Sequence, residues 1–224
     1  MKKYLFSFAQ EGKSLILVTM SLSIISILLY YRYEYDVFLT SFYLQTFYFL
    51  VCCFFFRDPL RQISSLDEDK FLSPADGTVL YVKDFKDPDI GDSKKIAIFL
   101  SFFNVHRQWV PSNSQVLNMH YNPGRYFIAF KDKASLDNEH TSILFKDKHD
   151  NPFRIKQIAG FVARRIVNHM KPELDVKIGQ KLGFIKFGSR VEIIVPNTFE
   201  VSVKKGDKVR GCKTILGEFK NSNS

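Results

Sequence analysis

The residues with the clearest chemical potential are Gly188 and Ser189, which are adjacent and lie between two β-rich stretches near the C-terminus. A serine hydroxyl is a weak nucleophile unless a neighbouring base activates it. With such a base, Ser189 could attack the carbonyl of Gly188, and an N→O acyl shift followed by β-elimination would cut the chain. Residue 189 would then carry a pyruvoyl group, an electrophile suited to decarboxylating amine substrates. A Gly-Ser pair is more commonly a plain turn, so this interpretation depends on the rest of the chain.

Asp76 and His106 are two further candidates. Asp76 lies in the turn-like sequence Ser-Pro-Ala-Asp-Gly-Thr-Val at 73–79, where a rigidly held carboxylate could orient a histidine. His106 follows the apolar stretch 96–102, just past the expected end of a strand. Each residue also has a purely structural explanation. Asp76 could belong to a common Asp-Gly turn, and His106 could be a packed or surface histidine. The other histidines show no HxH or HExxH spacing, so we expect no metal site.

Two apolar stretches near the N-terminus indicate a membrane segment. Residues 14–31 are 18 positions without a charge, and residues 37–56 are 20 such positions. A helix needs about 20 apolar residues to cross a bilayer, so we expect a helical hairpin in the membrane. The alternative is a hairpin buried in the core of a soluble protein. The cations that flank the hairpin place both chain ends in the cytoplasm by the positive-inside rule: Lys2, Lys3, Lys13, Arg57 and Arg61.

From Phe71 onwards the sequence becomes rich in short β-branched and aromatic stretches, separated by Gly, Asn, Asp and Pro. The expected strands are 78–82, 96–102, 115–120, 142–145, 190–195 and 199–203. The stretch 155–170 fits either one face of a helix or a pair of strands. The stretch 84–95 is expected to be a loop.

The overall composition indicates which class of partner the chain binds and in which cellular compartment it lies. The formal net charge is +9, from 32 Lys and Arg against 23 Asp and Glu, which favours an anionic partner such as anionic lipid, phosphate or nucleic acid. Three cysteines without a CxxC spacing indicate a reducing, cytoplasmic environment. We therefore expect a membrane hairpin over 1–60, with helices at about 14–31 and 37–56. A mainly β (α+β) domain of barrel-sandwich-like type is expected over 61–224.

Seven segments in the same order resemble the phosphatidylserine decarboxylase family in its short bacterial form. They are FFFRDPLR (54–61), SPADGTV (73–79), IFLSFFNVHRQWVP (98–111), YNPGRYFIAFKDKASLDNEH (121–140), IKQIAGFVARRIV (155–167), GQKLGFIKFGSRVEI (179–193) and KGDKVRGCKTILGEF (205–219). The resemblance covers roughly residues 54–219. Members of this family also carry an N-terminal membrane hairpin.

The resemblance implies a role for each candidate residue. Ser189 would be the self-cleavage nucleophile and the precursor of a covalent pyruvoyl cofactor, and Gly188 would supply the attacked carbonyl. Asp76 and His106 match the family's processing triad. His106 would help to deprotonate Ser189, while Asp76 would hold the tautomer of the histidine.

Two positions depart from the family pattern. The long form has a second histidine three residues after the first, and short forms commonly have Arg at that position, where this chain has Trp109. Short members usually have Glu-Arg where this chain has Glu139-His140.

The implied protein is a carboxy-lyase made as a zymogen. Cleavage between 188 and 189 would give a β chain and an α chain, which convert phosphatidylserine into phosphatidylethanolamine and CO2. We expect the enzyme at the inner membrane, with its catalytic domain on the cytoplasmic side. Its expected partner is anionic lipid and not nucleic acid, and a homo-oligomer is possible. Three alternatives stay open. They are a membrane-anchored lipoyl- or biotinyl-type module modified at Lys133, a membrane-tethered nucleic-acid or scaffold protein, and an inactive family member.

Overall fold

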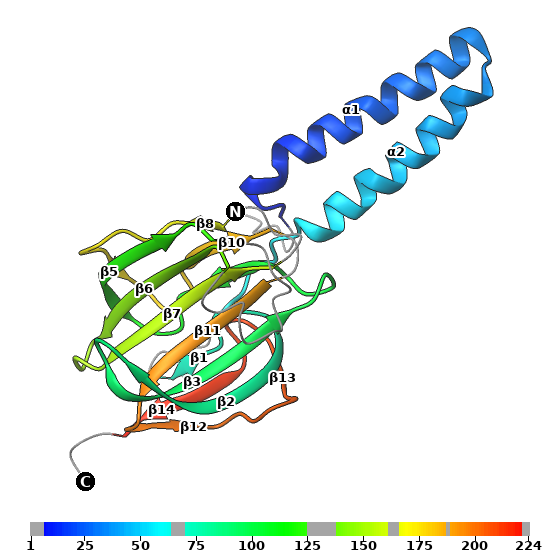
Figure 1. The fold of residues 1–224 in the computed structure, drawn as a ribbon. Coiled ribbons are helices and arrows are strands. Elements are labelled where there is room, and N and C mark those ends of the chain that lie inside the picture. Colours follow the sequence, from blue (N-terminus) through cyan, green and yellow to red (C-terminus); the bar gives the residue numbers. More distant parts are fainter. Residues whose placement is uncertain (1–6, 64–69, 125–137, 161–165, 187–188, 221–224) are drawn as a thin grey trace. The chain divides into compact units, whose positions relative to one another are not determined.

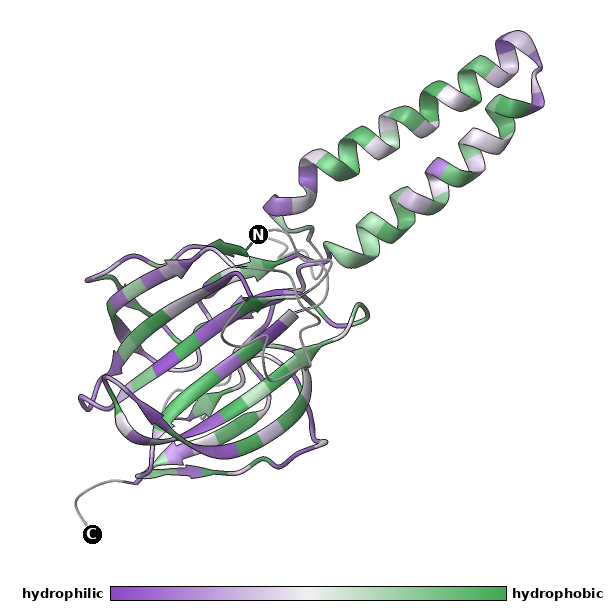
Figure 2. Ribbon diagram, in the orientation of Figure 1, coloured by the Kyte–Doolittle hydropathy of each residue, from purple (hydrophilic) through white to green (hydrophobic). Residues whose placement is uncertain are grey.

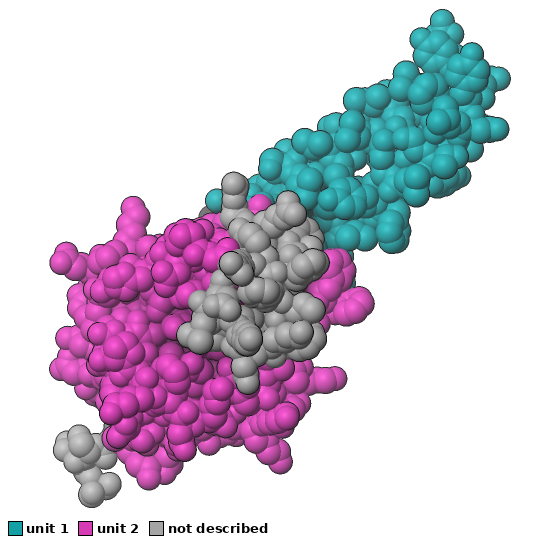
Figure 3. Space-filling view, in the orientation of Figure 1, with its two compact units in different colours: residues 1–60 teal, residues 61–224 magenta. Residues whose placement is uncertain are grey.

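The structure is a computed structural model of the 224-residue chain. It describes residues 7–63, 70–124, 138–160, 166–186 and 189–220. The chain forms two compact units, Met1–Leu60 and Arg61–Ser224, which have separate colours in Figure 3. The first unit is helical, and the second is built from strands (Figure 1).

The first unit is a hairpin of two long helices, α1 (Gln10–Tyr33) and α2 (Asp36–Phe55). Both are long and apolar enough to cross a membrane. The chain leaves α1 at Glu34, which adopts a left-handed φ of 58° and donates its N–H to the carbonyl of Tyr30. Such a left-handed residue is a common way to end a helix, because it satisfies a terminal carbonyl. Both expected helices are therefore present.

Small and polar side chains line the contact between the two helices. Ser23 Oγ lies 2.7 Å from Thr46 Oγ1, and Ser26 Oγ donates to Gln45 Oε1 at 3.1 Å. The large apolar side chains face outward instead, and both helices are strongly apolar in Figure 2 (Leu17, Leu28, Leu44 and Phe47 are examples). Polar groups inside and apolar groups outside are typical of helices packed in lipid. This arrangement disfavours the alternative of a hairpin buried in a soluble core.

An antiparallel sheet of eight strands forms most of the second unit, and it curls strongly (Figure 1). Its strand order is β13-β2-β3-β11-β7-β6-β5-β9. The strands in this order are Lys208–Val209, Gly77–Asp87, Gly91–Leu100, Ser189–Pro196, Pro152–Ala159, His140–Asp147, Ser114–Asn122 and Asp175–Val176. The strand β11 lies between β3 and β7, and both pair with it from Ser189 onwards.

Two small sheets complete the unit. One has the order β1-β14-β12, with strands Phe71–Leu72, Ile215–Phe219 and Phe199–Val201. The other has the order β4-β10-β8, with strands Arg107–Trp109, Lys181–Ile185 and Ile166–Asn168. The mainly β fold class with an N-terminal helical hairpin is thus confirmed.

One face of the large sheet forms the apolar core. Successive residues of a strand point to opposite faces, so Ile96, Ile98 and Leu100 of β3 face the same side. These residues are fully buried, as are Val191 and Ile193 of β11. The alternation of hydropathy along the strands is visible in Figure 2.

The six expected strands all fall within or across observed strands. The described part of the ambiguous stretch 155–170 includes the end of β7 and all of β8. The expected strand 96–102 ends earlier, at Leu100, because Asn104 closes a turn with Ser101.

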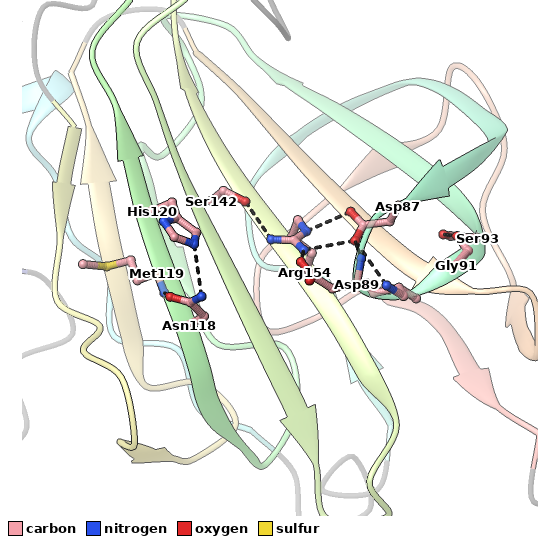
Figure 4. Close-up of polar contacts among 10 residues, drawn as sticks. Asp87, Asp89, Gly91, Ser93, Asn118, Met119, His120, Ser142 and Arg154 are labelled. Carbon is pink, nitrogen blue, oxygen red and sulfur yellow. Dashed lines mark hydrogen bonds and ion pairs between the residues drawn. The ribbon is translucent and has the colours of Figure 1, made fainter.

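The prediction that 84–95 is a loop is wrong. Here β2 and β3 form a hairpin, and Asp87 pairs directly with Gly91. The Asp87 carboxylate allows this short turn, because its Oδ1 accepts the N–H groups of Asp89 and Ile90 at 3.0 and 3.3 Å. From β7, Arg154 Nε donates to Asp87 Oδ2 at 2.8 Å, and the guanidinium also pairs with Asp89 (Figure 4). The charged sequence therefore forms strands because its polar groups find partners across the sheet.

Candidate active site

Ser189 opens the central strand of the large sheet. It is fully buried, and it pairs with Leu100 of β3 on one side and Ala159 of β7 on the other. Within the described part of the chain, its Oγ has no hydrogen-bond partner. Leaving a buried polar group unsatisfied costs about 1–3 kcal/mol, and such groups in native proteins call for a functional explanation. Gly188, the other member of the predicted pair, lies outside the described residues.

His106 lies directly ahead of β4 and is fully buried. Its ring is 6.4 Å from the ring of Phe184, between centroids, and its Nδ1 lies 3.0 Å from the carbonyl oxygen of Asn104. Because a carbonyl can only accept, this contact requires Nδ1 to carry a proton. In the neutral ring the basic lone pair is then on Nε2.

The chain connections limit how far His106 can lie from Ser189. The carbonyl of His106 accepts the N–H of Ile185 at 3.3 Å, and Ser189 follows only four residues later. Four residues span at most about 14 Å even when fully extended. On the other side, the segment 101–105 connects His106 to Leu100, the strand partner of Ser189.

Asp76 lies directly ahead of β2, and its carboxylate is held from two sides. Oδ1 accepts the N–H of Gly211 at 2.7 Å, and Oδ2 forms an ion pair with Arg61 Nη2, also at 2.7 Å. The Arg61 guanidinium also lies over the ring of Trp109, 5.1 Å from its centroid. A Cβ at position 211 would come within 2.4 Å of that ring, so glycine is required for this approach.

The sequence predicted that Asp76 orients His106, and this role stays a prediction. In the structure, the group next to His106 Nδ1 is the Asn104 carbonyl, while both oxygens of Asp76 receive hydrogen bonds from Arg61 and Gly211. Sequence reasoning missed these partners of Asp76. The only available signal was the unusual Trp109, which the structure places against the guanidinium of Arg61.

A chain of buried side-chain amides holds the backbone at His106. Gln108 Nε2 donates to the His106 carbonyl at 2.6 Å, and Gln157 Nε2 donates to Gln108 Oε1 at 2.8 Å. Asn168 Nδ2 then donates to Gln157 Oε1 at 2.7 Å. Both glutamines are fully buried. The three amides come from β4, β7 and β8, so they connect the histidine segment to the large sheet.

The opposite face of β11 carries a buried cluster of charges directly behind Ser189. Arg190 and Glu192 are fully buried and form an ion pair at 2.8 Å. Tyr81 donates its hydroxyl to Glu192 Oε1 at 3.0 Å, and Lys95 Nζ lies 3.7 Å from Glu192 Oε2. Burial lowers the pKa of Lys95, although Glu192 acts in the opposite direction. Tyr81 belongs to β2 and Lys95 to β3, so this cluster connects the first residues of β11 to both strands.

Glu139 and His140, where the chain departs from the family pattern, lie close to the end of β7 that pairs with Ser189. The Glu139 carbonyl accepts the N–H of Ala159 at 2.9 Å, and Tyr121 donates to the Glu139 carboxylate at 3.1 Å. His140 Nδ1 lies 2.8 Å from the carbonyl oxygen of Asn138, two residues earlier in the chain. His106 Nδ1 makes the same kind of contact with the carbonyl oxygen of Asn104. Lys133, the residue of the lipoyl-type alternative, lies outside the described residues.

These features define a class of protein: a mainly β domain with a buried serine at the start of its central strand, preceded in the chain by an apolar helical hairpin. A family model described as phosphatidylserine decarboxylase matches residues 48–217. Phosphatidylserine decarboxylase proenzymes of Rickettsia typhi and Rickettsia bellii are each 39% identical to the chain over 173 residues. These alignments cover 75% of this chain and 74% of each relative. The chain belongs to the phosphatidylserine decarboxylase family, which confirms the predicted resemblance and the prediction of an enzyme.

Proposed function

We propose that the chain is a phosphatidylserine decarboxylase proenzyme that cuts its own backbone between Gly188 and Ser189. The observation that supports this most directly is the buried Ser189 hydroxyl, which has no hydrogen-bond partner among the described residues. An alanine would fill the same position without that unfavourable burial, so the hydroxyl needs a chemical reason to be there.

In the proposed cleavage, Ser189 Oγ attacks the carbonyl carbon of Gly188, and the amide bond is exchanged for an ester. His106 accepts the hydroxyl proton on Nε2, because the Asn104 carbonyl keeps the other ring proton on Nδ1. β-Elimination then releases residue 188 as a carboxylate. Addition of water and loss of ammonia convert residue 189 into a pyruvoyl group. The products are a β chain of residues 1–188 and an α chain of residues 189–224.

The surroundings of Ser189 fit a pyruvoyl group. Its strand neighbours Leu100 and Ala159 are fully buried and apolar, so they shield a reactive carbonyl at this position from water. When present, the group supplies a carbonyl that takes up the substrate amine and an electron sink for the departing carboxylate. The buried pair Arg190–Glu192 would hold the new chain end in register, and His106 would return a proton to the substrate.

The helical unit would hold the enzyme in its substrate's membrane. A lipid with two acyl chains exposes much apolar surface when it leaves a bilayer, so a membrane-bound enzyme avoids that unfavourable step. The charges that flank the hairpin favour both termini in the cytoplasm, which supports a location of the domain 61–224 on the cytoplasmic side of the inner membrane. The excess of lysine and arginine, at a net charge of +9, favours an anionic leaflet.

The proposal is tested with the full chain in vesicles that contain phosphatidylserine labelled at its carboxyl carbon. Labelled CO2 should be released by the wild-type chain and not by Ser189→Ala. A wild-type chain that cleaves itself but releases no labelled CO2 would show that the substrate assignment is wrong. A single chain heavier than its sequence would instead favour the lipoyl- or biotinyl-type module.

A further inference from the structure

Two neighbouring phenylalanines, Phe102 and Phe103, are exposed on the turn that follows β3. The exposed fraction is 38% for Phe102 and 72% for Phe103, and their ring centroids are 5.8 Å apart with an edge-to-face geometry. Other large apolar side chains exposed in the described part of this unit are Leu117, Tyr121 and Ile215. None of these three is adjacent to another in sequence, so the phenylalanine pair is a distinct apolar feature.

The turn that presents the pair is firmly built. Asn104 Oδ1 accepts the N–H of Ser101 at 2.9 Å and the hydroxyl of Ser101 at 2.7 Å. The N–H of Asn104 donates to the carbonyl of Ser101 at 3.0 Å. These three hydrogen bonds close the turn around the two phenylalanines. Their exposure is therefore set by a defined local structure.

The same turn connects two parts of the candidate active site. It begins after Leu100, the strand partner of Ser189, and ends at Asn104, whose carbonyl faces His106 Nδ1. Any surface that covers the phenylalanine pair would therefore lie next to the candidate site. A lipid substrate has to reach that site with its acyl chains still in an apolar environment.

We propose that Phe102 and Phe103 insert into the membrane interface and hold this end of the candidate site against the bilayer. This inference rests on the proposed function, which makes the substrate a membrane lipid. Exposed phenylalanine rings are unfavourable in water, and they are favourable where they are buried at the boundary between the lipid headgroups and the acyl chains. The hairpin keeps the enzyme at a bilayer in any case, so a weak additional contact is sufficient to orient the site.

The first test uses fluorescence, because the chain has a single tryptophan, Trp109, which is 2% exposed. The full-length Phe103→Trp variant is placed in lipid nanodiscs with and without brominated acyl chains, beside an Ile215→Trp control. Bromine quenches only tryptophans in contact with the acyl chains. We expect strong quenching of the Phe103→Trp signal and none beyond the wild-type level for the control. Equal quenching of the two variants would overturn the inference, whether or not the chain cleaves itself.

The second test separates lipid access from chemistry. The Phe102→Ser/Phe103→Ser variant should cleave itself like the wild type, as measured by intact mass. Its activity on long-chain phosphatidylserine in vesicles, divided by its activity on a short-chain monomeric analogue, should fall about tenfold. The Leu117→Ser variant should keep the wild-type ratio. An unchanged ratio in the double variant would overturn the inference. A loss of self-cleavage would also overturn it, because it would assign the pair to the folding of the site.

Discussion

The carbonyl oxygen of Asn104 lies 3.0 Å from Nδ1 of the buried His106 ring. This contact decides which ring nitrogen can act as a base, because it keeps a proton on Nδ1 and leaves the lone pair on Nε2. The Asn104 side chain fixes that carbonyl by closing the turn with Ser101. The surface turn at 101–104 therefore determines which nitrogen of the buried His106 ring carries the proton.

We expect Asn104→Ala to slow self-cleavage by about tenfold or more, because two hydrogen bonds worth about 1 kcal/mol each are lost and the carbonyl is free to move. Asn104→Asp keeps an acceptor oxygen for Ser101 and should restore much of the rate. The measurement is the time course of the uncleaved fraction after synthesis, followed by mass. Equal rates for Asn104→Ala and the wild type would contradict the assigned role of the turn.

Asp76 and Arg61 can be separated by mutation. Arg61→Gln removes the ion pair but leaves the Asp76 carboxylate with its bond from Gly211, so it should lower the melting temperature while cleavage continues. Asp76→Asn should stop cleavage, because the proposed role of Asp76 in processing requires a carboxylate that orients His106. Arg210→Gln, at an exposed cation, serves as the control for loss of positive charge. Cleavage at the normal rate in Asp76→Asn would reduce Asp76 to a structural anchor.

The amide chain predicts a stability effect with a kinetic consequence. Gln157→Leu would leave Gln108 and Asn168 without their buried partner, which should lower the free energy of unfolding by about 1–3 kcal/mol. It should also slow cleavage, because Gln108 would no longer be held against the His106 carbonyl. Gln115→Leu, at a half-buried position of β5, should change neither property much. An unaltered cleavage rate in a destabilised Gln157→Leu variant would limit the amides to a structural role.

The hairpin of β2 and β3 predicts a pH dependence of stability. Burial alone would raise the pKa of Asp87, but hydrogen bonds from Arg154, Asp89 and Ile90 outweigh it and hold the pKa below its usual value. A group with a lowered pKa in the folded state contributes stability above its unfolded pKa, about 4 for Asp, and this contribution is lost as pH falls through the folded value. The melting temperature of the wild type should therefore drop below about pH 4.

Asp87→Asn tests this assignment. At neutral pH it should destabilise the protein by about 3 kcal/mol, because it leaves the buried Arg154 without its full partner. It should also flatten the fall in melting temperature at acidic pH. Asp150→Asn, at an exposed pair with Lys146, is the matched control and should behave like the wild type. An acid profile that Asp87→Asn leaves unchanged would mean that other carboxylates control the acid transition.

Sequence patterns predicted the strand that carries Ser189 and the position of His106 after a strand, because apolar alternation and turn residues act locally. They did not predict the partners of these residues. The hydrogen bonds from Arg61 to Asp76, from Gly211 to Asp76 and from Gln157 to Gln108 join residues 15, 135 and 49 positions apart. Such pairs depend on the register of distant strands, which no local pattern specifies. The charged hairpin around Asp87 was missed for the same reason, since its partner Arg154 lies in β7.

The most direct test of the central claim is the intact mass of the purified full chain, measured beside Ser189→Ala. Self-cleavage at Ser189 should give two chains for the wild type, residues 1–188 and residues 189–224, with the smaller chain lighter by one ammonia than simple hydrolysis would give. Ser189→Ala should remain a single chain. A folded wild-type protein that also stays a single chain would contradict self-cleavage at Ser189, and with it the pyruvoyl mechanism.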